Sequence, residues 1–155
     1  MEHILSAEEL KAIELAAARI KESAEGYLKR IGGELTVDNM GELTADEHAI
    51  LAYHIIRDEA MEGGFIQLIQ NGWGPYIFDN PFPYIYKQWG LKDLSKLLYA
   101  ARKEYHIHRE ELERDCSDED FMAKYELHEK LNDLGDLFLD EIQEVSTPVV
   151  AEHIS

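Results

Sequence analysis

Hydrophobic residues recur at helical spacing through the first part of the chain. Apolar side chains stand three or four residues apart over residues 10–31, which indicates one face of a long amphipathic helix. Ser6 and Glu9 have the spacing of a capping box at its start, and Gly32-Gly33 is a typical helix end. The sequence therefore predicts a long first helix, followed by a connector over residues 34–43.

The second apolar segment, about residues 45–62, is hydrophobic nearly all round and follows a second capping box. A helix of this kind is usually central and buried. Gly63-Gly64 is expected to break it. A short third helix over residues 65–70 is then expected to end at Asn71-Gly72.

Residues 73–90 are rich in proline and aromatic side chains and predict an irregular crossover, with one helical turn near residues 84–88. An apolar stripe over residues 94–112 predicts another long helix. A further helix is expected to begin after the Ser117 cap. Gly135 is a candidate kink within it.

We expect that last helix to end at Pro148, leaving residues 149–155 as a short final helix or a frayed tail. No segment alternates over the length of a strand, and no internal repeat is visible. The pattern predicts an all-α fold over residues 1–155, a single-domain bundle of about six to eight helices. Its expected landmark is a Gly-Gly elbow between two consecutive helices.

Charge changes this picture, because the formal net charge is −17. Residues 1–43 contribute −4, residues 44–109 contribute −1 and residues 110–155 contribute −12. A nucleic-acid binder would need clustered lysine and arginine, and so would a protein held to an anionic membrane. We therefore expect neither direct nucleic-acid binding nor membrane binding. A basic protein partner remains open, as does the simpler reading that acidity only maintains solubility.

The acidic last third contains the candidate partner-binding residues. Carboxylates crowd a predicted helix start and then recur about once per turn on one face of the following helix. The set comprises Asp118, Glu119, Asp120, Asp133, Asp136, Asp140, Glu141 and Glu144. One carboxylate per turn is one per ~5.4 Å, whereas a DNA strand has one phosphate per ~3.4 Å of axis. A single helix is therefore too dilute to imitate a strand, and two adjacent acidic helices or a dimer would be needed.

Catalytic chemistry has little support in the sequence. No Glu-x-x-His pair, nucleophile elbow or phosphate-binding loop is present, and a lone Cys116 supplies no zinc set. Glu104 with His108, and His54 with Asp58, are four residues apart and are read as ordinary helix pairs. We expect no metal, no cofactor and no enzymatic activity.

One stretch, EAMEGGFIQLIQNG at residues 59–72, resembles the signature of a bacterial family of helical proteins. That signature is roughly Glu-x-x-Asn-Gly-Gly-Phe-x-Gln, an aromatic pair, then Asn and a small residue. The matching positions are Glu59, Gly63, Gly64, Phe65, Gln67, Asn71 and Gly72. Glu62 stands where the family usually has Asn, and Leu68-Ile69 replace the aromatic pair. The resemblance covers about residues 44–145 and leaves 1–43 as an N-terminal helix and connector.

The best-known member of that family is an acidic, dimeric DNA-mimic protein. The resemblance implies the family fold, and a homodimer is its further implication. The resemblance does not by itself indicate DNA mimicry, because the signature is not an acidic surface. We interpret the signature as a structural elbow, in which Gln67 hydrogen-bonds the exposed backbone of the turn.

The leading hypothesis is a non-enzymatic cytoplasmic protein whose acidic third binds a basic protein. The resemblance implies that this partner is a DNA-binding protein held off DNA. Cys116 as the only cysteine suits a reducing compartment, and the start of the chain lacks the pattern of a secretory signal. One alternative is a small-ligand or peptide-binding domain with a pocket near Gly63-Gly64, walled by Trp73, Tyr76, Phe78 and Trp89. Others are a toxin-neutralising immunity-type protein and an enzyme with an unrecognised site.

Overall fold

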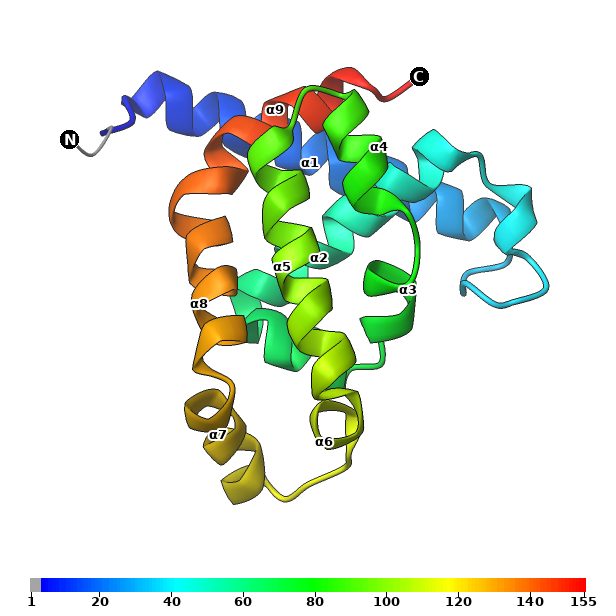
Figure 1. Ribbon diagram of the computed structural model, residues 1–155. Helices are drawn as coiled ribbons and strands as arrows, with labels where there is room; N and C mark the ends of the chain where they lie inside the picture. Colours follow the sequence, from blue (N-terminus) through cyan, green and yellow to red (C-terminus); the bar gives the residue numbers. More distant parts are fainter. Residues whose placement is uncertain (1–3) are drawn as a thin grey trace.

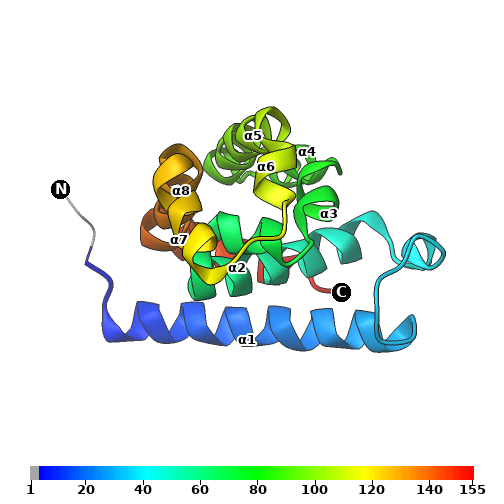
Figure 2. The same ribbon diagram turned by 90° about the horizontal axis from the view of Figure 1, so that it is seen from below.

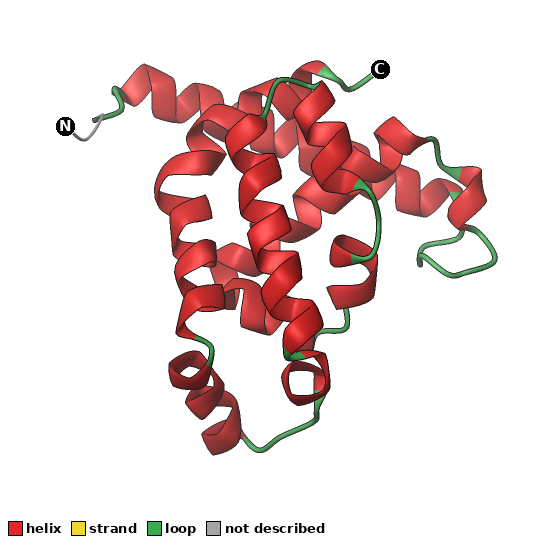
Figure 3. Cartoon of the chain, in the orientation of Figure 1, coloured by secondary structure: helices red, strands yellow, loops and turns green. Residues whose placement is uncertain are grey.

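The computed structural model describes residues 4–155 as a single all-α domain, and this part of the chain contains no strand (Figures 1 and 3). The expected fold class is therefore confirmed. The elements, in chain order, are α1 (Ala7–Arg30), η1 (Met40–Glu42), α2 (Ala45–Gln70), α3 (Gly74–Phe78), α4 (Phe82–Gln88), α5 (Lys92–Ile107), α6 (Arg109–Glu113), α7 (Asp118–Leu127), α8 (Glu129–Leu137), η2 (Phe138–Ile142) and α9 (Gln143–Glu152).

Helix α1 lies across one side of the bundle, as the view from below shows (Figure 2). The expected capping box is present, because Ser6 Oγ accepts from the Glu9 amide at 3.1 Å and Glu9 Oε1 accepts from the Ser6 amide at 3.2 Å. The helix ends before Gly32-Gly33, also as expected. Its apolar face, which includes Ile13 and Ile20, is buried where α1 packs on α2 and α9.

Helix α2 is the central element, and its buried side chains point to neighbours on several sides. Thr44 and Glu47 form the second capping box. Glu47 Oε1 also accepts from Arg30 Nη2 at 2.7 Å, so the end of α1 is tied to the start of α2. The connector between the two helices is therefore closed by a contact between charged side chains.

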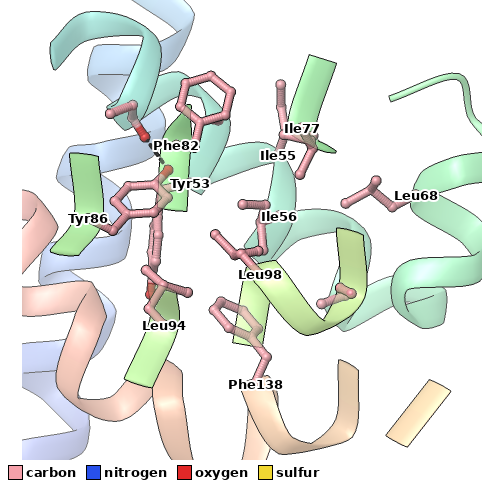
Figure 4. Close-up of a cluster of buried hydrophobic side chains, with 14 of the residues drawn as sticks. Tyr53, Ile55, Ile56, Leu68, Ile77, Phe82, Tyr86, Leu94, Leu98 and Phe138 are labelled. Atoms are coloured by element: carbon pink, nitrogen blue, oxygen red, sulfur yellow. Dashed lines mark hydrogen bonds between the residues drawn. The ribbon is translucent and has the colours of Figure 1, made fainter. Parts of the chain in front are cut away.

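The core lies where α2 meets α4, α5 and η2, and it contains several buried aromatic rings (Figure 4). Tyr53 and Tyr86 are fully buried. The Tyr86 hydroxyl donates to the Ala49 carbonyl at 2.7 Å, and the Tyr53 hydroxyl is 2.7 Å from the Ser146 and Thr147 hydroxyls of α9. Burying an apolar side chain of this size contributes ~1.5–3 kcal/mol, and these hydrogen bonds satisfy the polar tips. The core therefore joins α2 to α4 and α9.

Residues 73–90 are more helical than expected. Two short helices, α3 and α4, occupy this segment in place of an irregular crossover with one turn. Pro75 and Pro83 stand in the first turns of these helices, where the missing amide proton is not needed and the fixed φ favours the helix. The prolines therefore begin helices here.

Two long helices expected from the pattern are each divided at a histidine. His108 separates α5 from α6 with φ −112° and ψ 21°, and His128 separates α7 from α8 with φ −119° and ψ 47°. The two imidazole rings lie 5.0 Å apart between centroids. Each predicted helix is therefore interrupted although its apolar periodicity continues across the break, and the two breaks lie next to each other in the fold. Gly135, the candidate kink, lies inside α8.

The last helical path continues past Pro148, so the expectation that it ends there was wrong. Helix α9 runs to Glu152 with Pro148 inside it. An interior proline costs about 3 kcal/mol, but Val150 and Ala151 beyond it are buried and α9 packs closely on α1. The packing of this final turn outweighs the lost hydrogen bond.

Candidate functional site

The acidic residues at the start of α7 lie at the surface. Asp118, Glu119 and Asp120 occupy the first turn and are all exposed. Ser117 Oγ accepts from the Asp120 amide at 3.2 Å, which confirms Ser117 as the cap. Carboxylates at this position are stabilised by the partial positive charge of the helix N-terminus, which accounts for three acids in succession.

The second acidic group follows α8, η2 and α9, which form one helical path interrupted by the π turn of η2. Asp133, Asp136, Asp140 and Glu141 are exposed, while Glu144 is half-buried. A π turn inserts an additional residue, so the residues after it are rotated away from the preceding stripe. This rotation accounts for the half-buried position of Glu144.

Few cations compensate these carboxylates. Of the fifteen acidic residues in 110–155, only Glu111 and Glu113 take part in ion pairs within the part of the chain that the structure describes. Lys124, one of three bases in this segment, is buried, and Lys130 reaches Glu104 of α5 at 3.3 Å. We call the surface formed by the acidic residues between 118 and 144 the acidic face.

Helices α7 and α8, which carry most residues of the acidic face, follow one another on the same side of the molecule in both views (Figures 1 and 2). Residues 118–144 include ten acids: Asp118, Glu119, Asp120, Glu126, Glu129, Asp133, Asp136, Asp140, Glu141 and Glu144. These 27 residues reach at most ~40 Å at ~1.5 Å per residue, or about one carboxylate per 4 Å. That density approaches one phosphate per ~3.4 Å along a DNA strand.

The glycine signature forms a kink at one residue. Gly63 stays helical, while Gly64 has φ 79° and ψ −170°, a conformation that is essentially restricted to glycine. The Gly63 carbonyl accepts from the Tyr125 hydroxyl of α7 at 2.6 Å. Gly135 of α8 lies against the kink, since a Cβ there would stand 3.4 Å from the Phe65 amide nitrogen. Helices α7 and α8 therefore cover the elbow.

The polar residues of the signature connect the two sides of the elbow. Glu59 Oε2 accepts from Asn71 Nδ2 at 2.8 Å and from Gln67 Nε2 at 3.2 Å. Gln67 also donates to Glu62 Oε2 at 3.3 Å. Gln67 thus binds carboxylates rather than the turn backbone that we expected it to bind, and Tyr125 takes the backbone carbonyl instead.

The end of α2 has the geometry that Asn71-Gly72 predicts. Gly72 has φ 89°, and its amide donates to the Ile69 carbonyl at 3.0 Å. The Trp73 amide donates to the Leu68 carbonyl at 3.1 Å, which completes a Schellman motif. The left-handed residue is Gly72, while Asn71 precedes it with φ −80°.

The aromatic residues suggested as pocket walls do not surround the elbow together. Tyr76 and Phe78 are buried in the core. Trp89, at the end of α4, stacks on His153 with ring centroids 3.9 Å apart. The elbow itself is filled by α7 and α8, and this packing favours the structural interpretation of the signature.

A cluster that the sequence did not reveal joins α6 to α7 and to His128, at the break between α7 and α8. Glu111 of α6 contacts both Lys124 of α7 and His128, and Lys124 Nζ also donates to the Glu111 carbonyl. Burial raises the pKa of Glu111, but the hydrogen bond from His128 and the charges of His128 and Lys124 outweigh it and leave that pKa below its usual value. The spacing of Lys124 and His128, four residues apart, was the available signal.

The other histidine pairs behave as helix pairs. His108 Nε2 lies 3.7 Å from Glu104 Oε2. Burial lowers the pKa of His54, although the Asp58 carboxylate acts in the opposite direction. Among residues 4–155, no three His, Cys, Asp or Glu side chains are grouped so that they could hold a metal ion.

The described residues contain no helix with both the length and the apolar character needed to cross a membrane.

The fold and its surface define the class of protein: a single all-α domain with a kinked central helix and an acidic edge, most of whose carboxylates make no ion pair with the described residues. The model of a family described as "DMP19-like protein" matches residues 41–154, and the chain belongs to this family. The match extends beyond both ends of the region, about 44–145, in which the resemblance was seen.

A curated relative supports the same assignment. The chain is similar to "DNA mimic protein DMP19" of Neisseria meningitidis serogroup B (strain ATCC BAA-335 / MC58), with 37% identity over 71 residues. The matched segment covers 46% of this chain and 43% of the relative, which is less than half of either.

Proposed function

We propose that this chain is a non-enzymatic DNA mimic whose acidic face occupies the DNA-binding surface of a basic DNA-binding protein. The observation that carries the proposal is the row of carboxylates along α7, α8, η2 and α9, which are mostly exposed and nearly as dense as the phosphates of a DNA strand. Membership of the DMP19-like family and the printed name of the relative support the same function.

The charge distribution determines how such binding would behave. Unpaired carboxylates on a surface attract a basic partner from a distance and accelerate association. Salt screens exposed charges beyond roughly 8 Å at physiological ionic strength, so the affinity should fall steeply as salt rises. We expect the protein to act in the cytoplasm, where a DNA-binding target is accessible. The homodimer implied by the family resemblance remains a prediction, which sedimentation of the full chain would test.

A DNA-displacement assay tests the proposal. Purified basic DNA-binding proteins from the source organism are loaded with a short fluorescein-labelled duplex, and the chain is added while anisotropy is measured. We expect release of the duplex from at least one of them, with an apparent affinity that weakens as salt increases. Replacing four carboxylates, as Asp133→Asn, Asp136→Asn, Asp140→Asn and Glu141→Gln, should weaken release by at least about tenfold, equal to 1.4 kcal/mol.

A matched control removes four exposed carboxylates from α1: Glu8→Gln, Glu14→Gln, Glu22→Gln and Glu25→Gln. This variant has the same net charge as the first but keeps the acidic face. It should release the duplex like the unmodified chain. Equal losses in both variants would show that total charge suffices and would contradict a defined face. Binding to a basic protein without release of DNA would instead favour the toxin-neutralising alternative.

A further inference from the structure

A groove of about 720 Å³ separates the first half of α5 from the path of α8, η2 and α9. Its walls include the core residues Leu94 and Leu97 on one side, and Leu134 and Ile142 on the other. The groove opens between α5 and this path, and Glu141 of the acidic face is among its lining residues. Its volume is within the range of ~300–1,000 Å³ that is usual for binding sites.

The apolar character of the groove continues to its mouth. Leu137 and Val145 line it and are 39% and 68% exposed. An exposed leucine and valine next to an apolar concavity indicate a binding surface more strongly than apolar residues scattered singly over a surface do. The groove therefore offers apolar surface to an incoming molecule.

The two rims of the groove carry opposite charges. Lys92 and Lys96, one helical turn apart on the α5 rim, are exposed and make no ion pair within residues 4–155. Asp93 lies between them, in the first turn of α5, where the helix dipole stabilises it. Glu141 stands on the opposite rim, equally without an ion-pair partner in the described chain.

The lysine rim is exceptional in this protein. Residues 87–103 contain five bases and one acid in a chain of net charge −17. An acidic group on the occupant would complement Lys92 and Lys96, and a basic group would complement Glu141. A lipid with a single charged headgroup satisfies one rim only, whereas a helix can present both signs on either side of an apolar stripe.

We propose that this groove binds an amphipathic helix of a partner protein. The α5 wall extends from Leu91 to Ala100, which is about 14 Å or two to three helical turns. The occupant helix presents two or three apolar side chains at i, i+3 or i+4, and i+7 to the floor. Asp or Glu flanks that stripe on the α5 side, and Lys or Arg flanks it on the η2 side. This surface shares Glu141 with the acidic face but differs from it in its apolar walls and its lysine rim.

Synthetic peptides test this assignment. Three helical peptides of about 14 residues share one leucine stripe and differ in the residues on its two sides. The mixed-flank peptide has Glu on one side and Lys on the other. The second peptide has Glu on both sides, and the third has Lys on both sides. A fourth has the composition of the first in an order without a stripe. Each is labelled with fluorescein and titrated with the full chain by anisotropy. We expect the mixed-flank peptide to bind most tightly, and the peptide without a stripe to bind at least about tenfold more weakly.

Variants locate the binding site. Val145→Asp places a charge at the exposed mouth of the groove and should weaken binding of the mixed-flank peptide by at least about tenfold. Leu15→Asp, which changes an apolar side chain of similar exposure on α1, is the matched control and should leave binding of that peptide unchanged. The double variant Lys92→Glu, Lys96→Glu should transfer the preference to the peptide with two Lys flanks. Circular dichroism checks that each variant is folded.

Three results would overturn the proposal. The first is that the mixed-flank peptide binds no better than the peptide without a stripe, and the second is that Leu15→Asp weakens binding as much as Val145→Asp. Dissociation of a dimer by Val145→Asp in sedimentation experiments would show that a second copy covers the groove. DNA displacement by the Val145→Asp variant is measured in parallel, and we expect it to be unchanged. Failure of one proposal can thus be separated from failure of the other.

Discussion

At the scale of single residues, Gly64 illustrates how far local sequence carries a prediction. The pair Gly63-Gly64 marks the position of the kink, but the structure assigns the positive φ to Gly64 alone. Gly63 remains helical beneath the Gln67 side chain. The sequence could not make this choice, because both glycines allow either conformation. Tyr125 and Gly135, which lie far along the chain, cover the kink.

Replacement of Gly64 measures the importance of this conformation. An added Cβ would meet only Asn132 Oδ1 at 3.5 Å, an ordinary contact, so Gly64→Ala tests backbone strain rather than crowding. We expect it to lower the free energy of unfolding by about 1–3 kcal/mol, measured by urea denaturation. Gly26→Ala, at an open position inside α1, should raise that free energy by about 0.5–1 kcal/mol. No loss in Gly64→Ala would contradict the assigned conformation.

At the scale of elements, capping signals predicted helix starts better than periodicity predicted helix lengths. Both capping boxes and the Ser117 cap are present, because each requires only residues that are near in sequence. The breaks at His108 and His128 were missed, since the apolar stripe continues across both. Near these breaks, Glu111 of α6 contacts Lys124 of α7 and His128, and no local pattern contains these contacts.

The junction of α1 with α2 gives a prediction for pH. The hydrogen bond from Arg30, together with that from the Thr44 amide, lowers the pKa of Glu47 from 4.5 to about 2. A carboxyl whose pKa falls on folding stabilises the protein above its unfolded pKa, and this stabilisation is lost on acidification. Glu47→Gln should therefore destabilise the protein at pH 7, and the difference from the unmodified chain should shrink between pH 4.5 and about 2.

Chemical denaturation across this pH range measures the effect. Glu126→Gln, at an exposed carboxylate on α7, is the control and should change stability at pH 7 by less than about 0.5 kcal/mol. A constant difference between Glu47→Gln and the unmodified chain down to pH 2 would contradict the role of the Arg30–Glu47 pair.

At the scale of the whole molecule, the distribution of charge is as important as its total. Thirteen of the fifteen acidic residues in 110–155 take no part in an ion pair of the described chain, and residues 87–103 are basic. Repulsion among the carboxylates of the acidic face destabilises the folded protein. The surface proposed to bind a partner is therefore also one that salt should stabilise.

Thermal unfolding at increasing NaCl tests this consequence. We expect the midpoint to rise as salt screens the repulsion among exposed carboxylates. The triple variant Asp133→Asn, Asp136→Asn, Asp140→Asn should unfold at a higher temperature in low salt and depend less on NaCl. A midpoint that is independent of salt in the unmodified chain would show that these carboxylates do not repel one another appreciably.

The sequence by itself determined the all-α class, the capped starts of three predicted helices and the concentration of acid in the last third. Each depends on residue type and short spacing, which local hydrogen bonds and helical periodicity translate directly into structure. Tertiary structure decided which glycine kinks, where α5 and α7 end, and that α9 continues through Pro148. It also aligned α7 with α8 on one edge and opened the groove beside α5. These features depend on which distant side chains fill the same space, and that information is not local.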